Sequence, residues 1–466
     1  MIIDVLPDNV LLETFEFYLG KDDPVRLGRI YGHDYDEWQT LVHVCRRWRC
    51  IVFASPRRLD LKLYCTGKRL VDSNTWPALP IVIVTEDMQS KEEAINIIAA
   101  LRHHNRVCKI DCSSEKFQNL LLKEFAAIDE PFLALTSLAL SSYRRQQNVP
   151  VLPDSFLGGS APFLRSLHLH GIPYPSVGKL LLSTTNIVEL NLSCIPRSGY
   201  ISPETIVPCM STLARLESLK LGFQYPLSRV HRASRHPPPL TRAVLPNLTS
   251  LYFNGDVEYL EGILSQIEIP ILDHSRFYFF NQLLFDTPLL GHFIRRTEAF
   301  MEIHRATVDF SNCGVWITFW RRDERTNNKS DSDPLWLDIS CEALDWQLSA
   351  LAILNSFLSS LPTLEILEIA VSRKDWQGEI EPIQWREIFH LFTSVKDMIL
   401  GLENSVRLIA PALQVLAGER ETDVLPALQN IFLPTRDWQP SEPVKEAIEQ
   451  FIATRQLGGH PVTVHQ

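Results

Sequence analysis

Several features that mark whole classes of protein are missing from this 466-residue sequence. No apolar run reaches about 18 residues, the length that predicts a membrane-spanning helix. The opening residues, MIIDVLPD, carry neither a basic segment nor a small-residue cleavage site, so we expect no secretory signal. An excess of basic charge is missing too, because the formal net charge is −10. We therefore expect neither a nucleic acid nor a membrane as partner.

Patterns that would pair the cysteines are also lacking. The nine cysteines are odd in number, scattered along the chain and without a CxxC pair. This is typical of free thiols in a reducing compartment, so we expect an intracellular protein, in the cytoplasm, the nucleus or both. Cys108 and Cys112 lie four residues apart on an expected strand without a histidine pair. We interpret them as structural thiols rather than metal ligands.

Catalytic signatures are absent from the sequence. It contains no GxxxxGK[ST] phosphate loop, no GxGxxG after a strand, no HExxH and no GxSxG. We therefore expect a protein that is not an enzyme and that holds neither a cofactor nor a metal ion.

Two amphipathic segments stand near the start of the chain. Residues 6–19 begin with Leu-Pro-Asp and place apolar side chains on one side of a short helix. Residues 37–52 have apolar residues three and four positions apart, which predicts one helix with an apolar stripe. Residues 21–36 are polar, with one proline and two glycines, as in an exposed connection. So much apolar surface on so small a unit indicates a docking module.

From residue 107 onward a short pattern recurs: an apolar residue, two variable positions, then Leu-x-Leu or its equivalent. The fourth position of the first seven copies falls at residues 110, 138, 167, 190, 219, 251 and 275, with spacings of 23 to 32 residues. This is in or near the range of leucine-rich repeats. Several intervening segments look helical, at 177–183, 202–214 and 259–267. We therefore predict an α/β fold in which strand-plus-return units stack into a solenoid with one continuous core. A compact doubly wound sheet is the alternative.

The predicted organisation has four parts. They are a helical module at 1–58, a linker with entry strands at 59–104, a leucine-rich-repeat-like solenoid at 105–435, and a capping helix and tail at 436–466. The expected entry strands are 59–63 and 79–84, followed by a helix at 91–101, and the capping helix spans about 442–455. The repeat pattern blurs at about 281–360, where residues 308–320 resemble a hairpin. There the repeat is either degenerate or interrupted by an insertion.

Residues between the leucines of each strand point to the opposite face of the sheet, because side chains alternate along a strand. A mixed polar and aromatic face suits recognition of a partner. The candidate target-binding residues are His168, His170, Asn191, Lys220, Tyr252, Arg276 and Tyr278. The basic, proline-rich stretch at 228–239 is either a grip for an acidic or phosphorylated segment or a solvated loop.

The N-terminal segments resemble an F-box. The resemblance covers residues 4–58 and rests on the Leu-Pro helix followed by the run Val44-Cys45-Arg46-Arg47-Trp48. With repeats behind it, this arrangement is similar to that of the substrate receptors of cullin-type ubiquitin ligases. More closely, the runs at 38–48, 55–61 and 151–162 look like the expanded F-box family of mushroom-forming fungi.

The resemblance implies a role rather than a substrate. F-box helices dock on a Skp-type adaptor that is in turn bound to a cullin. By that match the adaptor-binding residues would be Leu6, Pro7, Val10, Leu11, Phe15, Leu41, Val44, Cys45 and Trp48. We therefore expect a substrate-recognition adaptor of a Skp–cullin–F-box ubiquitin ligase, which binds an unknown protein on its repeat surface. The alternative is a non-catalytic leucine-rich-repeat scaffold for protein interaction, whose N-terminal helices cap the array.

Overall fold

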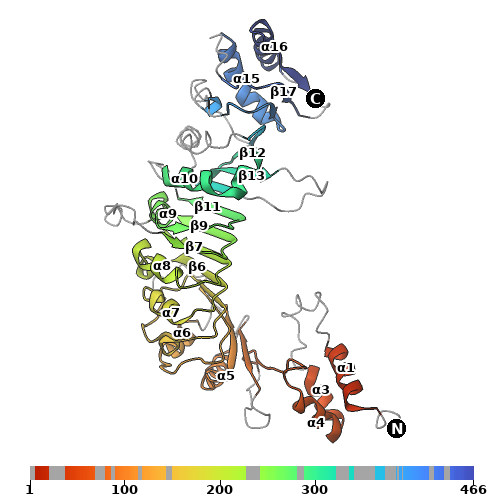
Figure 1. Ribbon diagram of the computed structural model, residues 1–466, viewed down its shortest axis with the longest axis vertical. Coiled ribbons are helices and arrows are strands. Elements are labelled where there is room, and N and C mark those ends of the chain that lie inside the picture. The colour runs from red at the N-terminus through yellow and green to blue at the C-terminus, as the bar shows by residue number, and fades with distance from the viewer. Residues whose placement is uncertain are drawn as a thin grey trace. The chain divides into compact units, whose positions relative to one another are not determined.

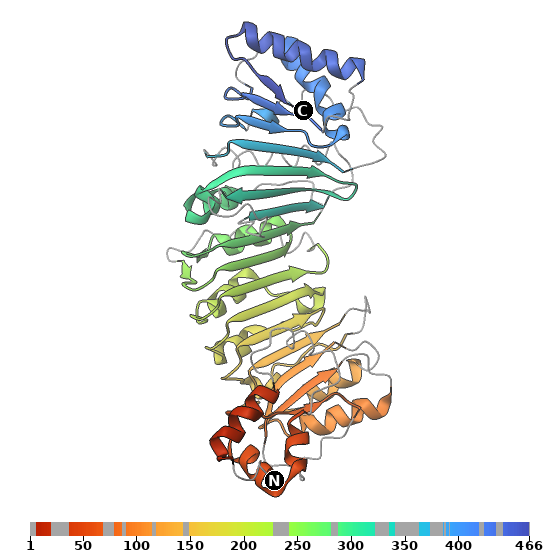
Figure 2. The same ribbon diagram turned by 90° about the vertical axis from the view of Figure 1, so that its right-hand side faces the viewer.

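The computed structural model contains two compact units, residues 1–187 with 198–200 and residues 188–197 with 201–466. Figures 1 and 2 show their elements. The structure describes residues 6–19, 37–68, 79–85, 90–113, 118–142, 149–226, 242–280, 288–321, 335–340, 363–372, 385, 388–390, 392–418, 424–434 and 441–465. The predicted connection at 21–36 and the basic stretch at 228–239 lie outside these residues.

The described part of the first unit begins with the short helices α1 (Asp8–Leu19), α3 (Glu37–Val44) and α4 (Arg46–Ala54). The prediction of one helix over 37–52 is wrong at a single residue. Cys45 has an extended backbone (φ −159°, ψ 168°), and its sulfur accepts a hydrogen bond from the Trp48 N–H at 3.5 Å. An extended residue cannot continue a helix, so Cys45 ends one helix and caps the next.

The first unit continues with five parallel strands in chain order. They are β1 (Leu63–Cys65), β2 (Ile81–Thr85), β3 (Val107–Cys112), β4 (Ser137–Ser141) and β5 (Ser166–His170), with α5 (Lys91–Leu101), α6 (Gln118–Ala126), the 3-10 turn η3 (Phe156–Gly159) and α7 (Val177–Ser183) between or after them. Leu138 lies opposite both Ile110 and Leu167, and all three are buried. The predicted repeat positions are therefore confirmed as neighbours in the sheet.

The first predicted entry strand, at 59–63, is wrong. Asp60 has a left-handed backbone (φ 49°), which a strand does not allow, and β1 starts only at Leu63. Leu59 and Leu61 are nevertheless buried, so the alternating pattern predicted the buried residues correctly although the segment is not a strand.

The second unit repeats the same plan in β6 (Glu189–Ile195), β7 (Ser218–Phe223), β9 (Ser250–Gly255) and β11 (His274–Phe279). Leu190, Leu219, Leu251 and Ser275 are in register, as the repeat spacing predicts. The helices α8 (Pro203–Met210) and α9 (Val257–Leu264) lie on one side of these strands (Figure 1), and the other face of the strands is turned to the viewer in Figure 2. A separate two-stranded pair joins β8 (Ala243–Val244) to β10 (Ile267–Glu268).

The stretch where the repeat blurs is an insertion into the same sheet. After α10 (Pro288–Arg296) and α11 (Glu298–Met301) come β12 (Ile303–Phe310), β13 (Gly314–Arg321) and β14 (Leu335–Ser340). The order in the sheet is β11-β14-β13-β12-β15, and β13 is antiparallel to both neighbours. The predicted hairpin is thus confirmed.

Arg321 anchors the end of this hairpin. Its guanidinium donates to the Asp273 carboxylate at 2.7 Å, to the Asp273 carbonyl at 2.9 Å and to the Ala299 carbonyl at 3.1 Å. The two bonds to Asp273 tie β13 to the loop that precedes β11, two strands away in the sheet, and the third ties it to α11.

The chain returns to parallel strands with β15 (Ile366–Val371), β16 (Asp397–Ile399), β17 (Asn430–Phe432) and β18 (Thr463–His465). The accompanying helices are α15 (Glu403–Gly418) and α16 (Glu442–Leu457). The predicted terminal helix at 442–455 is confirmed. Its buried Arg455 donates to the Leu425 carbonyl at 3.0 Å. Taken together, the parallel strands with intervening helices form an irregular leucine-rich-repeat-like α/β fold.

Candidate interaction surfaces

The Leu-Pro turn at the start of α1 is held by Arg47. The Arg47 guanidinium donates to the Leu6 carbonyl at 2.5 Å and to the Asp8 carboxylate at 2.7 Å. The Pro7 carbonyl accepts hydrogen bonds from the N–H groups of Val10 and Leu11 in the first turn of α1, each at 3.1 Å. Exposed ion pairs contribute little to stability. The effect of Arg47 is positional, since it fixes the Leu-Pro turn beside the start of α4.

The predicted adaptor-binding residues divide into two groups. Leu11, Phe15 and Leu41 are at most 5% exposed, and the Phe15 ring packs 4.7 Å from that of Trp48. These three side chains form the core of the helical module. They hold the helices together and are not on the surface of the module.

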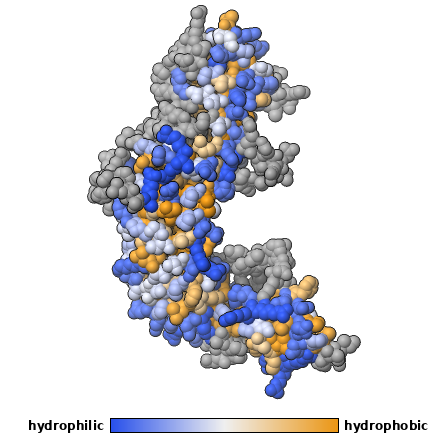
Figure 3. Space-filling view, in the orientation of Figure 1, coloured by the Kyte–Doolittle hydropathy of each residue, from blue (hydrophilic) through white to orange (hydrophobic). Residues whose placement is uncertain are grey.

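The other six predicted residues are accessible and define what we call the N-terminal apolar surface. Pro7, Val44 and Cys45 are exposed, with Val44 at 56%, and Leu6, Val10 and Trp48 are partly exposed. Figure 3 shows hydrophobic residues on the visible side of this module.

Sequence reasoning missed two further exposed aromatic residues of α1. Phe17 is 89% exposed and Tyr18 is 45% exposed. The sequence does predict the exposure of Phe17, because residue 17 lies two positions after the buried Phe15 and therefore on the opposite side of the helix.

The sheet face of the first unit carries small side chains beside two histidines. His168 lies opposite Ala139 and His170 opposite Ser141, and both imidazoles are half-buried. The structure brings these two predicted residues onto one face, as expected from strand alternation.

The sheet face of the second unit has different contents. Asn191, Lys220, Tyr252 and Arg276 are consecutive neighbours in one row across the strands, and Trp336 of β14 continues it. The Lys220 ammonium lies 4.2 Å from the centroid of the Tyr252 ring, and the Arg276 guanidinium lies 5.6 Å from that of Trp336. Both distances suit cation–π attraction. The structure therefore gathers four of the predicted residues into one row.

A second row runs beside the first. Tyr278, the last predicted residue, lies opposite Asp338 of β14, which lies opposite Trp316 of β13. The rings of Tyr252 and Tyr278 are 5.1 Å apart and so connect the two rows. Trp316, Trp336 and Asp338 were missed as site residues. The alternation at 335–339 does indicate a strand, but nothing local indicates that this strand lies next to β11.

Burial controls the ionisation of this face. It raises the pKa of Tyr252 to about 12, and the neighbouring Tyr278 adds to that effect. Burial also raises the pKa of Tyr278 and that of the Asp338 carboxyl. The tyrosine hydroxyls, already protonated at neutral pH at their ordinary pKa of 10, therefore remain hydrogen-bond donors into more alkaline solution.

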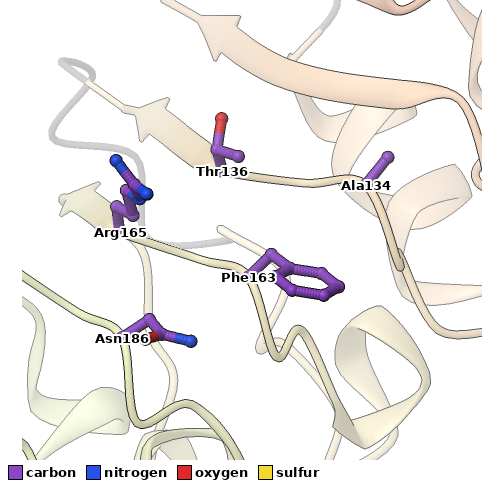
Figure 4. Close-up of a pocket in the computed structure, with 5 residues that line it drawn as sticks. All are labelled: Ala134, Thr136, Phe163, Arg165 and Asn186. Atoms are coloured by element: carbon purple, nitrogen blue, oxygen red, sulfur yellow. The ribbon is translucent and has the colours of Figure 1, made fainter.

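A shallow hollow of about 460 Å³ lies in the first unit (Figure 4). It is lined by Ala134, Thr136, Phe163, Arg165 and Asn186, from the segments that lead into the strands. Asn186 is engaged, because its side-chain amide donates to the Pro162 carbonyl at 2.9 Å. We assign no ligand to the hollow, because few polar groups converge on it.

The described part of the chain contains no group of three or more His, Cys, Asp or Glu side chains placed to hold a metal ion. Its eight cysteines are free, and burial raises the pKa of Cys112 to about 12, as for a structural thiol. None of its helices is both long and apolar enough to cross a membrane.

Comparisons with known proteins add one distant likeness. No model of a protein family matches this chain, and no curated protein matches it. Among solved structures, the chain is similar to the leucine-rich repeat-containing protein LegL7 from Legionella pneumophila, at 16% identity over 71% of this chain and 93% of that one, with a TM-score of 0.28. At that score the likeness carries no weight, and the fold assignment rests on the register of the strands.

Proposed function

We propose that this protein is a substrate-recognition subunit of a Skp–cullin–F-box ubiquitin ligase. The observation that carries the proposal is the N-terminal module: its described helices, α1, α3 and α4, have a Leu-Pro turn fixed by Arg47 and leave Pro7 and Val44 exposed. Its sequence resembles an F-box, and the partner of an F-box is a Skp-type adaptor that is bound to a cullin.

The N-terminal apolar surface fits a protein partner in energetic terms. Apolar patches on a small soluble module mark interaction sites. Burying such side chains stabilises a complex by about 25 cal/mol per Å². Trp48 is partly exposed and already packed on Phe15, so it would be an ordered anchor that loses little side-chain entropy on binding.

The sheet face of the second unit is the proposed target-binding surface. Repeat folds recognise proteins on such faces, and aromatic and cationic residues are enriched in interfaces. No catalysis is assigned to this chain; a separate enzyme would transfer ubiquitin, in the cytoplasm, the nucleus or both.

Co-elution with a purified Skp-type adaptor tests the proposal. The wild-type chain should co-elute, and Val44→Asp should weaken binding at least tenfold because it places a charge in an apolar interface. Leu133→Asp is the matched control, since Leu133 is similarly exposed but lies outside the module, before β4. Absence of wild-type binding would reject the ligase proposal.

One contact favours the second candidate, a scaffold capped by its N-terminal helices. The indole N–H of Trp38 donates to the Lys62 carbonyl at 3.0 Å and so joins α3 to the entry of β1. A scaffold would not bind the adaptor. In addition, Leu11→Ala in α1 would lower the unfolding midpoint of the sheet, whereas a docking module would lose only its own structure.

A further inference from the structure

A row of acidic and aromatic side chains crosses the half-exposed sheet face of the second unit. In register across four strands it reads Tyr278, Asp338, Trp316 and Asp309. Neighbouring strands lie about 4.8 Å apart, so each side chain stands beside the next. Trp336 lies two residues before Asp338 and therefore on the same face of β14.

Asp338 is thus bordered by aromatic residues on three sides. Tyr278 and Trp316 flank it across the strands, and Trp336 lies next to it along its own strand. All four side chains are partly exposed, while the residues between them on each strand are buried. We call Tyr278, Trp316, Trp336 and Asp338 the aromatic cage.

The negative charge of the cage is not compensated within the part of the chain that is described. Asp338 has no ion-pair partner there, because Arg276 lies over the Trp336 ring and Arg305 is bound to Glu368 at 2.6 Å. Burial raises the pKa of the Asp338 carboxyl. Beyond Trp316, one oxygen of Asp309 accepts from Ser372 at 3.0 Å, and the other is buried without a hydrogen-bond partner among the described groups. Half-buried carboxylates without a cation are unfavourable.

We propose that the aromatic cage binds a Lys or Arg side chain from an extended segment of a partner protein. The faces of Trp and Tyr rings attract cations, the carboxylate neutralises the charge, and the rings pack on the aliphatic stem of the side chain. The inference deepens the target-binding half of the proposed function and rests on it only for the identity of the partner as a ligase target.

Charge complementarity favours a basic segment over an acidic one. Lys220 and Arg276, the two cations of the adjacent row, already lie over the rings of Tyr252 and Trp336. Asp338 has no ion-pair partner among the described residues, and the group that complements a carboxylate is a cation.

Fluorescence anisotropy on the full-length chain tests the proposal. The probes are fluorescein-labelled nine-residue peptides of Ser, Thr and Val that differ only at a central Lys, Arg, norleucine or Glu. We expect the Lys and Arg peptides to bind about tenfold more tightly than the norleucine peptide, and the Glu peptide to bind more weakly. Asp338→Asn and Trp316→Ala should each remove this preference, and Trp316→Phe should retain most of it.

Two matched variants serve as controls. Trp320→Ala changes the same residue type on the same strand and face, but Trp320 lies opposite Arg305 rather than opposite a carboxylate. Asp397→Asn removes another carboxylate of the half-exposed face, on β16. Both should leave the preference for Lys unchanged. Equal binding of the Lys and norleucine peptides, tightest binding of the Glu peptide, or an equal loss in Trp320→Ala would overturn the proposal.

The experiment separates this inference from the proposed function. Asp338→Asn should still co-elute with a Skp-type adaptor while losing the preference for Lys. A wild-type chain that prefers the Lys peptide without binding the adaptor would leave the cage intact and reject the ligase role. Adaptor binding without a preference for Lys would reject the cage alone.

Discussion

The strands β4 and β5 of the first unit and the strands β7, β9, β11 and β14 of the second obey one packing rule and carry different side chains on their outward faces. On the first unit the outward positions of β4 and β5 hold only serine, alanine and histidine, at residues 137, 139, 141, 166, 168 and 170. On the second unit the corresponding rows hold lysine, arginine, tyrosine, tryptophan and aspartate. In both units the alternate positions are buried leucines or their equivalents. The core positions therefore fix the fold, and the outward positions are free to determine what is recognised.

The difference coincides with the break in the repeat. Trp316, Trp336 and Asp338 come from β13 and β14, which interrupt the regular succession of strands. The insertion places aromatic residues beside strands whose own outward positions already hold Arg276 and Tyr278. Of the two sheet faces, the one with more charged and aromatic side chains is thus the one that contains the insertion.

The strongest test of the shared rule is in the core. Leu138→Ala in the first unit and Leu219→Ala in the second should each lower the free energy of unfolding by about 2–5 kcal/mol, because both side chains are buried at equivalent positions. Urea denaturation measures the loss. A cost below about 1 kcal/mol at either position would show that the two cores are not equivalent.

The inserted strands should depend on Arg321. Arg321→Ala removes two bonds from β13 to Asp273, in the loop before β11, and one to Ala299 of α11, and we expect a cost of about 1–3 kcal/mol. Hydrogen exchange in β13 and β14 should rise more than in β7. Arg407→Ala is the control: it breaks only an exposed pair with Glu403 one helical turn away and should cost about 0.3–0.5 kcal/mol.

Local and non-local features of the chain differ in how well the sequence predicts them. The repeat positions, α5 and α7 agree with prediction, because the spacing of apolar residues reports on each element separately. The break at Cys45 was not predicted, since the apolar spacing continues across it. The aromatic cage was missed for another reason: its members meet only because β14 pairs with β11, across an insertion that no short-range pattern reveals.

Ionisation of Asp338 should give a smaller, pH-dependent difference in stability between the wild-type chain and Asp338→Asn. Its carboxyl has a pKa raised above the ordinary value of 3.8 by burial, among Tyr278, Trp316 and Trp336. Below that ordinary value the carboxyl is protonated in both the folded and the unfolded state, and its burial does not lower the stability of the fold. As the pH rises from the ordinary to the raised value, the unfolded state loses its proton more readily than the folded state, so the folded state loses stability. Asp338→Asn should therefore unfold at a slightly higher temperature than wild type at pH 7, with the gap closing by pH 4. A lower unfolding midpoint for Asp338→Asn than for wild type at pH 7 would contradict the inference that the Asp338 charge is uncompensated.

The smallest expected change in stability concerns Lys220, one of the two cations of the first row. Lys220→Met retains the apolar stem but removes the ammonium over Tyr252, and we expect a cost of about 0.5 kcal/mol in the free energy of unfolding.

His168→Ala at the outward face of the first unit should change neither peptide binding nor the preference for Lys. A loss of that preference in His168→Ala would mean that the two faces do not differ as described. Thermal unfolding and peptide anisotropy on the same samples measure both.

The strand order of the insertion also constrains the time course of folding. A repeat array can grow by adding each strand to the one before it. Here β11 ends at residue 279, yet its next neighbour, β14, is complete only at residue 340. At usual elongation rates the ribosome needs about 3–12 s to cover that interval. Throughout that time the far edge of β11 has no strand to pair with and is open to other chains. During synthesis, the protein is therefore exposed to mispairing at the strand that carries Arg276 and Tyr278.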